Sequence, residues 1–296
     1  MWTAAPAHMI AAMNGGTGHS QVFAPGMLEG TAALVTGGGT GLGKASALEL
    51  ARCGARVTIA GRRAEVLEAA AEEIGAGATG AVQWVAGDVR EREGARRLVE
   101  AALERGGGRL DVLVNNAGGQ YFSPAEQIAS KGWQAVWRLN VDGVLNMAEA
   151  AFELALEPAG AGMVINVTLS PHHGMPGMAH SGAARAAVEA LTRELARRWL
   201  AAGVAVTAVA AGHFETEVLA KYPESVRAGA ASTVPLQRLG TVAEHAWLIA
   251  LLASPLGRAF NGSTITLDGA RDNWCGPWPP PGLADEAGEV PMEERR

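Results

Sequence analysis

The chain has 296 residues, of which 48% are hydrophobic and 18% are charged, a composition typical of a globular protein. The formal net charge of -6 excludes a broad basic face, so we expect no nucleic-acid partner. Cys53 and Cys275 stand in unrelated contexts, which argues against a disulfide framework and a zinc site, and we expect no metal. No stretch of about 18 apolar residues is free of charges and turn signals, so we expect no membrane segment.

Short apolar segments rich in Val or Ile alternate with helical patterns along most of the chain. We expect strands over residues 32–36, 56–60, 82–86, 111–115, 163–168, 204–209 and 263–267. We expect helices between them over residues 43–53, 64–74, 91–105, 133–156, 181–202 and 241–253. This alternation predicts a single α/β domain in which a doubly wound parallel (Rossmann) sheet carries helices on both faces.

We expect that domain to span residues 25–270. Residues 1–24 lack the basic start and apolar centre of a secretory signal, and they predict a flexible N-terminal arm. Residues 271–296 are rich in proline and charge, and they predict an irregular C-terminal tail. Trp274 and Trp278 favour docking of part of this tail, and a disordered tail is the alternative.

Residues 36–43 read Thr-Gly-Gly-Gly-Thr-Gly-Leu-Gly and join the first expected strand to the first expected helix. Glycine permits positive φ angles and close backbone approach, and the free N–H groups at a helix start favour a phosphate. A strand, a glycine-rich turn and a helix in this order therefore predict a cradle for the pyrophosphate of a dinucleotide. A glycine-rich loop without a ligand is the alternative. The expected contacts are Thr36, Gly37, Thr40, Gly41, Leu42 and Gly43.

Arg62 and Arg63 follow the second expected strand, where a cofactor with a free ribose 2′-hydroxyl would call for an acid. Guanidinium groups pair well with phosphate, so these residues predict NADP(H) rather than NAD(H). Two solvated arginines that open a helix are the alternative. Asp88 follows the third strand and is placed to accept a hydrogen bond from the adenine amino group, although a turn or helix-cap role would also explain it.

Several ordered stretches occur at fixed spacings: Thr36-Gly37 with Gly41-Leu42-Gly43, Asp88-Val89, Asn115-Asn116-Ala117-Gly118, Asn140-Val141-Asp142-Gly143 and Ala186-Ala187-Val188-Glu189-Ala190-Leu191-Thr192. Together they resemble the short-chain dehydrogenase/reductase family over about residues 25–270. The resemblance implies that Val89, Asn115, Ala117 and Gly118 help to bind the cofactor. The family's Pro-Gly after the sixth strand appears here as Ala211-Gly212, and the resemblance places Gly212 and Thr216 beside the nicotinamide.

The family's catalytic Asn, Ser, Tyr and Lys are only partly present. Asn140 matches the Asn, Ser181 stands at the Tyr position, Arg185 stands at the Lys position, and the Ser position falls within residues 168–170. Carbonyl reduction needs a proton from a positioned acid of suitable pKa. A serine hydroxyl is a much poorer acid than a phenol, and a guanidinium that is always protonated cannot relay a proton as lysine can. The sequence therefore disfavours an ordinary alcohol dehydrogenase.

Reduction of a C=C bond conjugated to a thioester makes a lighter demand, because the charge that develops on the thioester oxygen needs only hydrogen-bond donors. Residues 118–126 and 180–185 look like the peroxisomal trans-2-enoyl-CoA reductase branch of the family, which is related to the 2,4-dienoyl-CoA reductases. The resemblance implies NADPH-dependent reduction of the C2=C3 bond of trans-2-enoyl-CoA, an acyl thioester. The ending Glu293-Glu294-Arg295-Arg296 is no peroxisomal address, and we expect a cytoplasmic protein.

The expected catalytic residues are Asn140, Ser181, Arg185 and Tyr121. We expect Arg185 to bond the nicotinamide ribose and to hold positive charge near the enolate, and Ser181 to donate to the substrate oxygen. Asn140 would anchor a water molecule or Arg185, and Tyr121 would donate to the substrate or protonate its α carbon. Each role has a competing structural explanation. Arg185 would be a surface arginine, and Ser181 a small residue that packs in the core. Asn140 would satisfy the backbone of a kinked helix, and Tyr121 would pack as an aromatic ring.

The histidines and the second tyrosine are weaker candidates. His172 and His173 are adjacent with no acid nearby in sequence, which disfavours a metal site and leaves CoA binding or proton donation as alternatives. His180 and His213 flank the expected pocket and are of the type that titrates near neutral pH. Tyr222 lies in an expected substrate lid, where packing is favoured over catalysis.

Two other functions compete with the enoyl thioester reductase. One is a carbonyl reductase or other oxidoreductase that uses a displaced acid such as Tyr121 or His172. The other is an NADP-binding protein without catalysis. The resemblance also implies a homotetramer built on the helices expected over residues 133–156 and 181–202, whose Ala-rich faces would allow close packing.

Overall fold

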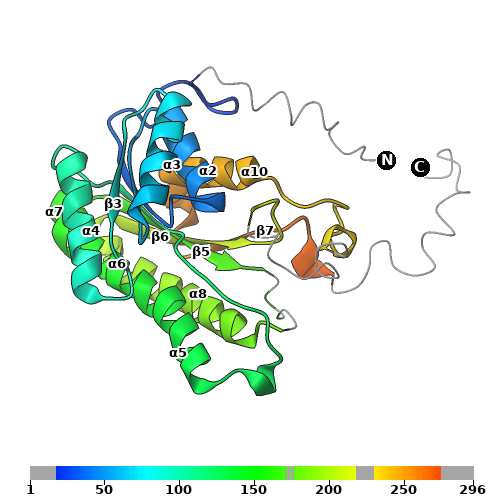
Figure 1. The fold of residues 1–296 in the computed structure, drawn as a ribbon. Helices are drawn as coiled ribbons and strands as arrows, with labels where there is room; N and C mark the ends of the chain where they lie inside the picture. Colours follow the sequence, from blue (N-terminus) through cyan, green and yellow to red (C-terminus); the bar gives the residue numbers. More distant parts are fainter. Residues whose placement is uncertain (1–17, 171, 173, 175–176, 218–229, 275–296) are drawn as a thin grey trace, which may run out of the picture.

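The computed structural model describes residues 18–170, 172, 174, 177–217 and 230–274. Within these residues lies a sheet of seven parallel strands in the order β3-β2-β1-β4-β5-β6-β7 (Figure 1). The strands are β1 (Ala32–Thr36), β2 (Arg56–Gly61), β3 (Val82–Ala86), β4 (Val112–Asn115), β5 (Gly162–Leu169), β6 (Val204–Ala211) and β7 (Thr264–Leu267). The order reverses between β1 and β4, which confirms the predicted doubly wound sheet.

Helices cover both faces of the sheet (Figure 1). One face carries α2 (Gly41–Arg52), α3 (Ala64–Ala76) and α10 (Val242–Ala253). The other face carries α4 (Arg92–Arg105), α6 (Gly143–Ala151) and α8 (Ala179–Trp199), while α5 (Ser130–Trp137) packs against α8. Short helical pieces complete the described chain: α7 (Glu157–Ala159) and the 3-10 turns Ala125–Gln127, Leu200–Ala202, Ala231–Thr233, Pro255–Phe260 and Arg271–Asn273.

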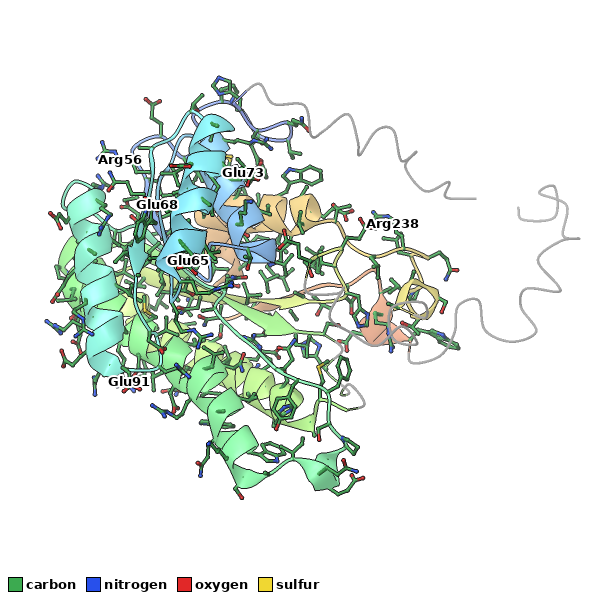
Figure 2. The ribbon with its side chains drawn as sticks, viewed as in Figure 1. Arg56, Glu65, Glu68, Glu73, Glu91 and Arg238 are labelled. Atoms are coloured by element: carbon green, nitrogen blue, oxygen red, sulfur yellow. The ribbon has the colours of Figure 1, made fainter. Side chains whose placement is uncertain are left out.

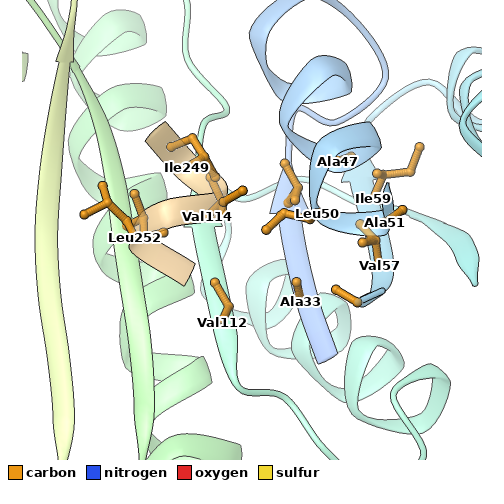
Figure 3. Packing of buried hydrophobic residues seen from close by; sticks show 14 of the residues in the cluster. Ala33, Ala47, Leu50, Ala51, Val57, Ile59, Val112, Val114, Ile249 and Leu252 are labelled. Atoms are coloured by element: carbon orange, nitrogen blue, oxygen red, sulfur yellow. The ribbon is translucent and has the colours of Figure 1, made fainter. Parts of the chain in front are cut away.

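The strands are apolar on both faces because helices bury both. In β1, Ala33 and Val35 belong to the core under α2, α3 and α10, whereas Leu34 belongs to the core under α4, α6 and α8. Figure 3 shows the first of these cores, where Leu50 of α2 and Ile249 of α10 are fully buried over the strands. Burial of each such large side chain contributes about 1.5–3 kcal/mol, so packing rather than helix propensity holds the layers together.

The helix expected over residues 133–156 is the main correction to the predicted elements. It begins earlier, in α5 at Ser130, and π-helical turns at Arg138–Asp142 and Phe152–Leu156 interrupt it. In the first turn, Asn140 Nδ2 donates to Val136 O at 2.8 Å and so compensates the disturbed backbone ladder. The helix expected over 181–202 begins at Ala179 and ends in a 3-10 turn, and the other expected bounds differ by at most two residues.

Charges lie on the outer faces of the helices. Glu65, Glu68 and Glu73 project along the exposed side of α3 (Figure 2), and Glu73 pairs with Lys44 of α2. Such exposed pairs contribute little stability, about 0–1 kcal/mol each. In the part of the chain that the structure describes, no helix has the length and apolar character needed to cross a bilayer.

All seven strands run in one direction, so their carboxyl ends meet at one edge of the sheet. The chain also returns to this edge after β7, where the backbone N–H of Asp272 donates to the Asp268 side chain at 2.7 Å. Most of the expected arm and tail, residues 1–17 and 275–296 with Trp278, lies outside the described residues. The same holds for His173 and for residues 218–229, which include Tyr222 of the expected lid.

Candidate active site

A cavity of about 710 Å³ lies at the carboxyl edge of the sheet. Its walls come from the turn after β1, the ends of β2, β4, β5 and β6, and the first turns of α8. Most of the expected site residues line it: Gly37, Thr40, Gly41, Leu42, Arg62, Arg63, Asp88, Val89, Ala117, Gly118, Tyr121, Ser181, Arg185, Gly212 and Thr216. Four expected site residues lie outside that lining, namely Thr36, Gly43, Asn115 and Asn140.

The turn after β1 requires glycine for two physical reasons. Gly37 has φ +65°, and a Cβ there would lie 2.9 Å from Asn116 Nδ2. A Cβ on Gly43 would lie 2.3 Å from the Gly37 carbonyl oxygen, so only glycine lets α2 pack this closely on the turn. Thr40 precedes α2 without capping it through its side chain, which leaves the first N–H groups of the helix facing the cavity as an anion site.

Thr36 and Asn115 stabilise the cavity wall from behind. The Thr36 hydroxyl donates to Val114 O at 3.2 Å and accepts from the backbone N–H groups of Asn116 and Ala117 at 3.1 and 3.0 Å. This ties the end of β1 to the loop after β4. Asn115 Nδ2 donates to Asn166 Oδ1 at 3.0 Å inside the sheet. In the structure both residues shape the backbone that faces the cavity, while Asn116 reaches the lining.

Arg62 and Arg63 are exposed at the mouth of the cavity, and within the described residues neither is in an ion pair. Asp88 lies beside them and is held by Arg90, whose Nε donates to its two carboxylate oxygens at 2.9 and 3.0 Å. The hydrogen bonds from Arg90 outweigh burial and lower the pKa of Asp88. This end of the cavity therefore offers two exposed arginines that are in no ion pair among the described residues, beside an ionised aspartate whose pKa the charge of Arg62 also lowers.

Ser181 and Arg185 lie one turn apart on α8 and point to the same cavity wall. The Ser181 hydroxyl is fully buried and has no hydrogen-bond partner among the described residues. The Arg185 side chain is also buried, and it donates to Val167 O at 2.8 Å. Desolvation lowers the pKa of Arg185 to about 10, so the guanidinium stays charged at neutral pH. The pair forms a site where a buried anionic oxygen would find a hydroxyl donor and a cation.

Asn140 is joined to the loop after β4. Its side chain donates from Nδ2 to Gly119 O at 2.8 Å and accepts at Oδ1 from Gly119 N at 3.2 Å. A Cβ on Gly118 would lie 2.1 Å from Arg185 Nη2 and 2.8 Å from Asn140 Oδ1, so this loop passes directly over both side chains. The structure thus gives Asn140 the role of satisfying a disturbed helix and holding a cavity loop.

The aromatic and histidine candidates surround the outer part of the cavity. Tyr121 is 42% exposed, its ring packs edge-on against His180 at 4.5 Å, and its hydroxyl lies so close to α5 that a Cβ on Gly132 would be 2.0 Å away. His180 is buried behind this ring, and burial lowers its pKa. His213 lines the cavity, and its pKa is lowered by burial and by Arg271. Both histidines are therefore neutral near pH 7.

Known proteins resemble the chain over nearly its whole described length. The enoyl-(acyl carrier protein) reductase family matches residues 37–270. A probable, (2E)-enoyl-CoA-producing 2,4-dienoyl-CoA reductase of Bacillus subtilis strain 168 is 37% identical, covering 85% of this chain and 100% of the relative. A peroxisomal 2,4-dienoyl-CoA reductase of Arabidopsis thaliana is 33% identical, covering 83% of this chain and 86% of the relative.

The solved structure of a citronellol catabolism dehydrogenase from Pseudomonas aeruginosa PAO1 has a TM-score of 0.76 at 41% identity. The match covers 85% of this chain and 98% of that chain. The chain belongs to the short-chain dehydrogenase/reductase family. The resemblance drawn from the sequence is therefore confirmed, and the chain is an oxidoreductase whose Rossmann sheet binds a nicotinamide dinucleotide.

The residues present fit that dinucleotide. The glycine turn leaves room that a Cβ would fill, and the start of α2 directs N–H groups into the cavity. Ser181 and Arg185, which the resemblance assigns to the Tyr and Lys positions of this family, both line the cavity wall. Of the stretch that holds the family's Ser position, Thr168 and Leu169 line the cavity, whereas Ser170 is buried and donates to Asp268.

Two acids near the site, Glu189 and Asp272, were not predicted as site residues from the sequence. Glu189 accepts from Thr168 Oγ1 at 2.9 Å and lies 3.0 Å from His172 Nε2, and Asp272 Oδ2 lies 2.5 Å from His172 Nδ1. Glu189 could have been found, because it follows Arg185 by one helical turn on the same face of α8. Asp272 meets His172 across 100 residues, and no sequence pattern brings them together.

Proposed function

We propose that this chain is an NADPH-dependent reductase of the C=C bond of 2-enoyl thioesters, with trans-2-enoyl-CoA as the substrate class. One observation carries the proposal: a buried serine hydroxyl and a buried arginine, Ser181 and Arg185, face the cavity without a carboxylate between them among the described residues. A bound reduced nicotinamide would supply the hydride. The task left to the protein is to stabilise negative charge on the thioester oxygen and to provide one proton.

Ser181 and Arg185 suit the first of these tasks. As hydride reaches the β carbon, electron density moves to the thioester oxygen, and donors placed in advance stabilise that charge. The Ser181 hydroxyl is free to donate among the described residues, and the Arg185 cation has no carboxylate to neutralise it there. Removal of one donor of this kind from an enzyme costs about 2.7–4 kcal/mol of transition-state stabilisation.

The same wall is poorly suited to carbonyl reduction. An alkoxide formed from a ketone needs a proton on oxygen from a positioned acid of suitable pKa, and the resemblance places Ser181 where the family has its phenol. The Tyr121 hydroxyl packs against α5 at Gly132, and His213 is neutral because burial lowers its pKa. These observations favour an alkene over a ketone, and the dienoyl-CoA reductases among the relatives support the same substrate class.

NADPH is proposed over NADH from the cations at the end of β2. Arg62 and Arg63 are exposed at the cavity mouth and are in no ion pair within the described residues, so a ribose 2′-phosphate would give them a partner. We keep the homotetramer and the cytoplasmic location as further predictions.

The test is a panel of substrates read by NADPH absorbance. We expect turnover of 2-enoyl-CoA or 2,4-dienoyl-CoA esters, much slower turnover with NADH, and none with simple ketones. Ser181→Ala should lower kcat by about 100-fold, because one oxyanion donor is removed. Ser263→Ala, an exposed serine before β7, is the matched control and should leave kcat unchanged.

The panel also decides between the competing functions. Reduction of ketones with no reduction of any enoyl thioester would overturn the proposal and favour a carbonyl reductase. Tight NADPH binding with no turnover of any substrate would favour a binding protein. Preference for dienoyl over enoyl esters would keep the chemistry and refine the substrate.

A further inference from the structure

His172 is held by carboxylates at both ring nitrogens. Nδ1 lies 2.5 Å from Asp272 Oδ2, and Nε2 lies 3.0 Å from Glu189 Oε1. The backbone N–H of His172 also donates to Asp272 Oδ1 at 2.5 Å, which fixes the ring in this orientation. Carboxylates only accept hydrogen bonds, so both ring contacts are satisfied together when the imidazole carries a proton on each nitrogen.

The second carboxylate leads from this ring to the active-site cavity. Glu189 Oε1 accepts from Thr168 Oγ1 at 2.9 Å as well as facing His172 Nε2. Thr168 lines the cavity, and the Glu189 side chain is only 10% exposed. The His172 side chain is 35% exposed and so reaches solvent. Thr168, Glu189 and His172 therefore form one continuous hydrogen-bonded line from the cavity wall to water.

The charges around His172 favour its protonated form. Burial alone would lower the pKa of His172, but the hydrogen bond to Asp272 and the negative charges of Glu189 and Asp272 outweigh it, so the pKa is raised. Glu189 faces the ring from α8, and Asp272 faces it from the turn after β7. Asp268 joins the same network, because it accepts from the Ser170 hydroxyl and from the Asp272 N–H.

The reduction needs such a supply of protons. Hydride transfer gives the β carbon one hydrogen together with two electrons. One proton must then come from solvent to the α carbon to complete the saturated bond. Arg185 cannot relay it, because a guanidinium does not give up its proton near neutral pH, even with its pKa lowered to about 10. The Ser181 hydroxyl has no partner among the described residues through which it could be reprotonated.

We propose that Thr168, Glu189 and His172 relay this proton from solvent to the cavity. His172 Nε2 gives its proton to Glu189, and the resulting neutral imidazole takes one from bulk water. The Thr168 O–H, which donates to Glu189 in the structure, turns to the cavity and gives its proton to the acceptor there, directly or through one water, and the Thr168 oxygen takes the proton from Glu189. Each hop breaks one O–H or N–H bond and forms another, so all three groups end as they began.

This inference deepens the proposed function and rests on it only in that a reduction consumes a proton. The main test is the pH dependence of kcat in His172→Gln, measured with whichever substrate the wild-type protein reduces best. Wild-type kcat should be level at acid pH and fall by about tenfold per pH unit above the pKa of His172. His172→Gln should lose at least 10-fold in kcat at pH 6.5, keep KM within twofold, and show no such fall.

A second pair of variants tests the cavity end of the relay. Thr168→Val keeps the shape of the side chain but removes the hydroxyl, so kcat should fall at least 10-fold and the solvent deuterium isotope effect on kcat should rise. Thr168→Ser restores a hydroxyl and should recover kcat to within threefold. His19→Gln changes an exposed histidine elsewhere and should match the wild type in both measurements.

Added imidazole distinguishes a relay from an anchor. His172 is partly exposed, so imidazole in the buffer should restore part of the kcat of His172→Ala in proportion to its protonated fraction. If His172→Gln and Thr168→Val keep the wild-type pH profile and isotope effect, the relay is wrong while the proposed function stands. If the wild-type protein reduces no substrate, both proposals fall together.

Discussion

Arg185 is a buried cation, and buried cations in proteins are ordinarily paired with a negatively charged group. Within the described residues it donates only to a carbonyl oxygen, Val167 O, and no carboxylate neutralises it. Removing a charge from water costs several kcal/mol unless it is paired. A folded chain that retains this cation therefore carries a cost in stability, which function explains if the missing anion is supplied by the reaction.

Arg185→Met should accordingly separate activity from stability. We expect kcat for the preferred enoyl thioester to fall by about 100-fold or more, because the cation that stabilises the developing oxyanion is lost. In the absence of cofactor, the free energy of unfolding should equal or exceed that of the wild type, because a buried charge has been removed. Turnover assays and urea unfolding measure the two effects.

Arg193→Met is the control for this experiment, because it changes an exposed arginine two turns further along α8. It should leave both quantities unchanged. Retention of full activity by Arg185→Met would remove the residue from the catalytic assignment.

At the residue scale, the family resemblance located Ser181 and Arg185, and spacing along α8 would also have located Glu189. Ser181, Arg185 and Glu189 follow one another at intervals of four on α8, so any one of them points to the other two. Asp272 and Arg90 gave no such signal. Asp272 reaches His172 through the path of the chain after β7, and Arg90 takes the Asp88 carboxylate that the sequence alone reserved for adenine. Contacts of this kind depend on tertiary packing and not on a periodic pattern.

At the scale of elements, the π-helical turn Arg138–Asp142 is the feature that joins packing to the site. It brings the Asn140 side chain to the loop after β4. There the side-chain amide forms hydrogen bonds with both the N–H and the C=O of Gly119. A regular helix with the same residues would shift this side chain around the axis. The irregular turn therefore sets the position of a loop that lines the cavity.

Asn140→Ala should weaken both the fold and cofactor binding. Val136 O and the Gly119 backbone lose their partners, which costs about 1–3 kcal/mol for each buried group left unsatisfied. Release of the loop should also raise the Kd for NADPH by about tenfold, equivalent to about 1.4 kcal/mol. Thermal unfolding and fluorescence titration measure these effects. The control is Gln134→Ala on the exposed side of α5, which should change neither. An unchanged Kd with reduced stability would show that Asn140 does not position the loop.

The sequence predicted which elements exist better than where they are interrupted. The strands could be predicted from short apolar runs, because a buried parallel strand has few polar residues. The helices could be predicted from the periodic spacing of their apolar residues. The π-helical turns were not predicted, because an apolar face continues through them without a break. The bounds of β5 and β6 extend one or two residues further than expected, into segments whose pairing is fixed by the neighbouring strand.

For the whole molecule, buried histidines lower the stability of the folded state in acid. His245 of α10 is fully buried between the ring of Phe214 and Ser46 of α2, whose Oγ lies 3.2 Å from Nδ1. Burial lowers the pKa of His245 to about 4. The unfolded chain binds a proton here below pH 6.5, whereas the folded chain does not until about pH 4, so stability falls as the pH falls through this window.

Three further described histidines affect this response, and they do not all act in the same direction. Burial lowers the pKa values of His180 and His213, so these two residues also favour the folded state at higher pH. His172 acts in the opposite direction. Its pKa is raised, so its contribution is complete below the pKa of the unfolded chain and is lost as the pH rises through the folded value.

His245→Gln should therefore make the protein less sensitive to acid. Between pH 7 and pH 5 the linkage at this one site amounts to about 2 kcal/mol, or about 4 °C in Tm for a domain of this size. The variant loses ring packing against Phe214 and should melt lower than the wild type at pH 7, yet its further loss of Tm at pH 5 should be smaller by about that amount. Melting curves at fixed protein concentration give both differences. If the wild type and the variant lose the same Tm on acidification, His245 is not the site at which acid acts.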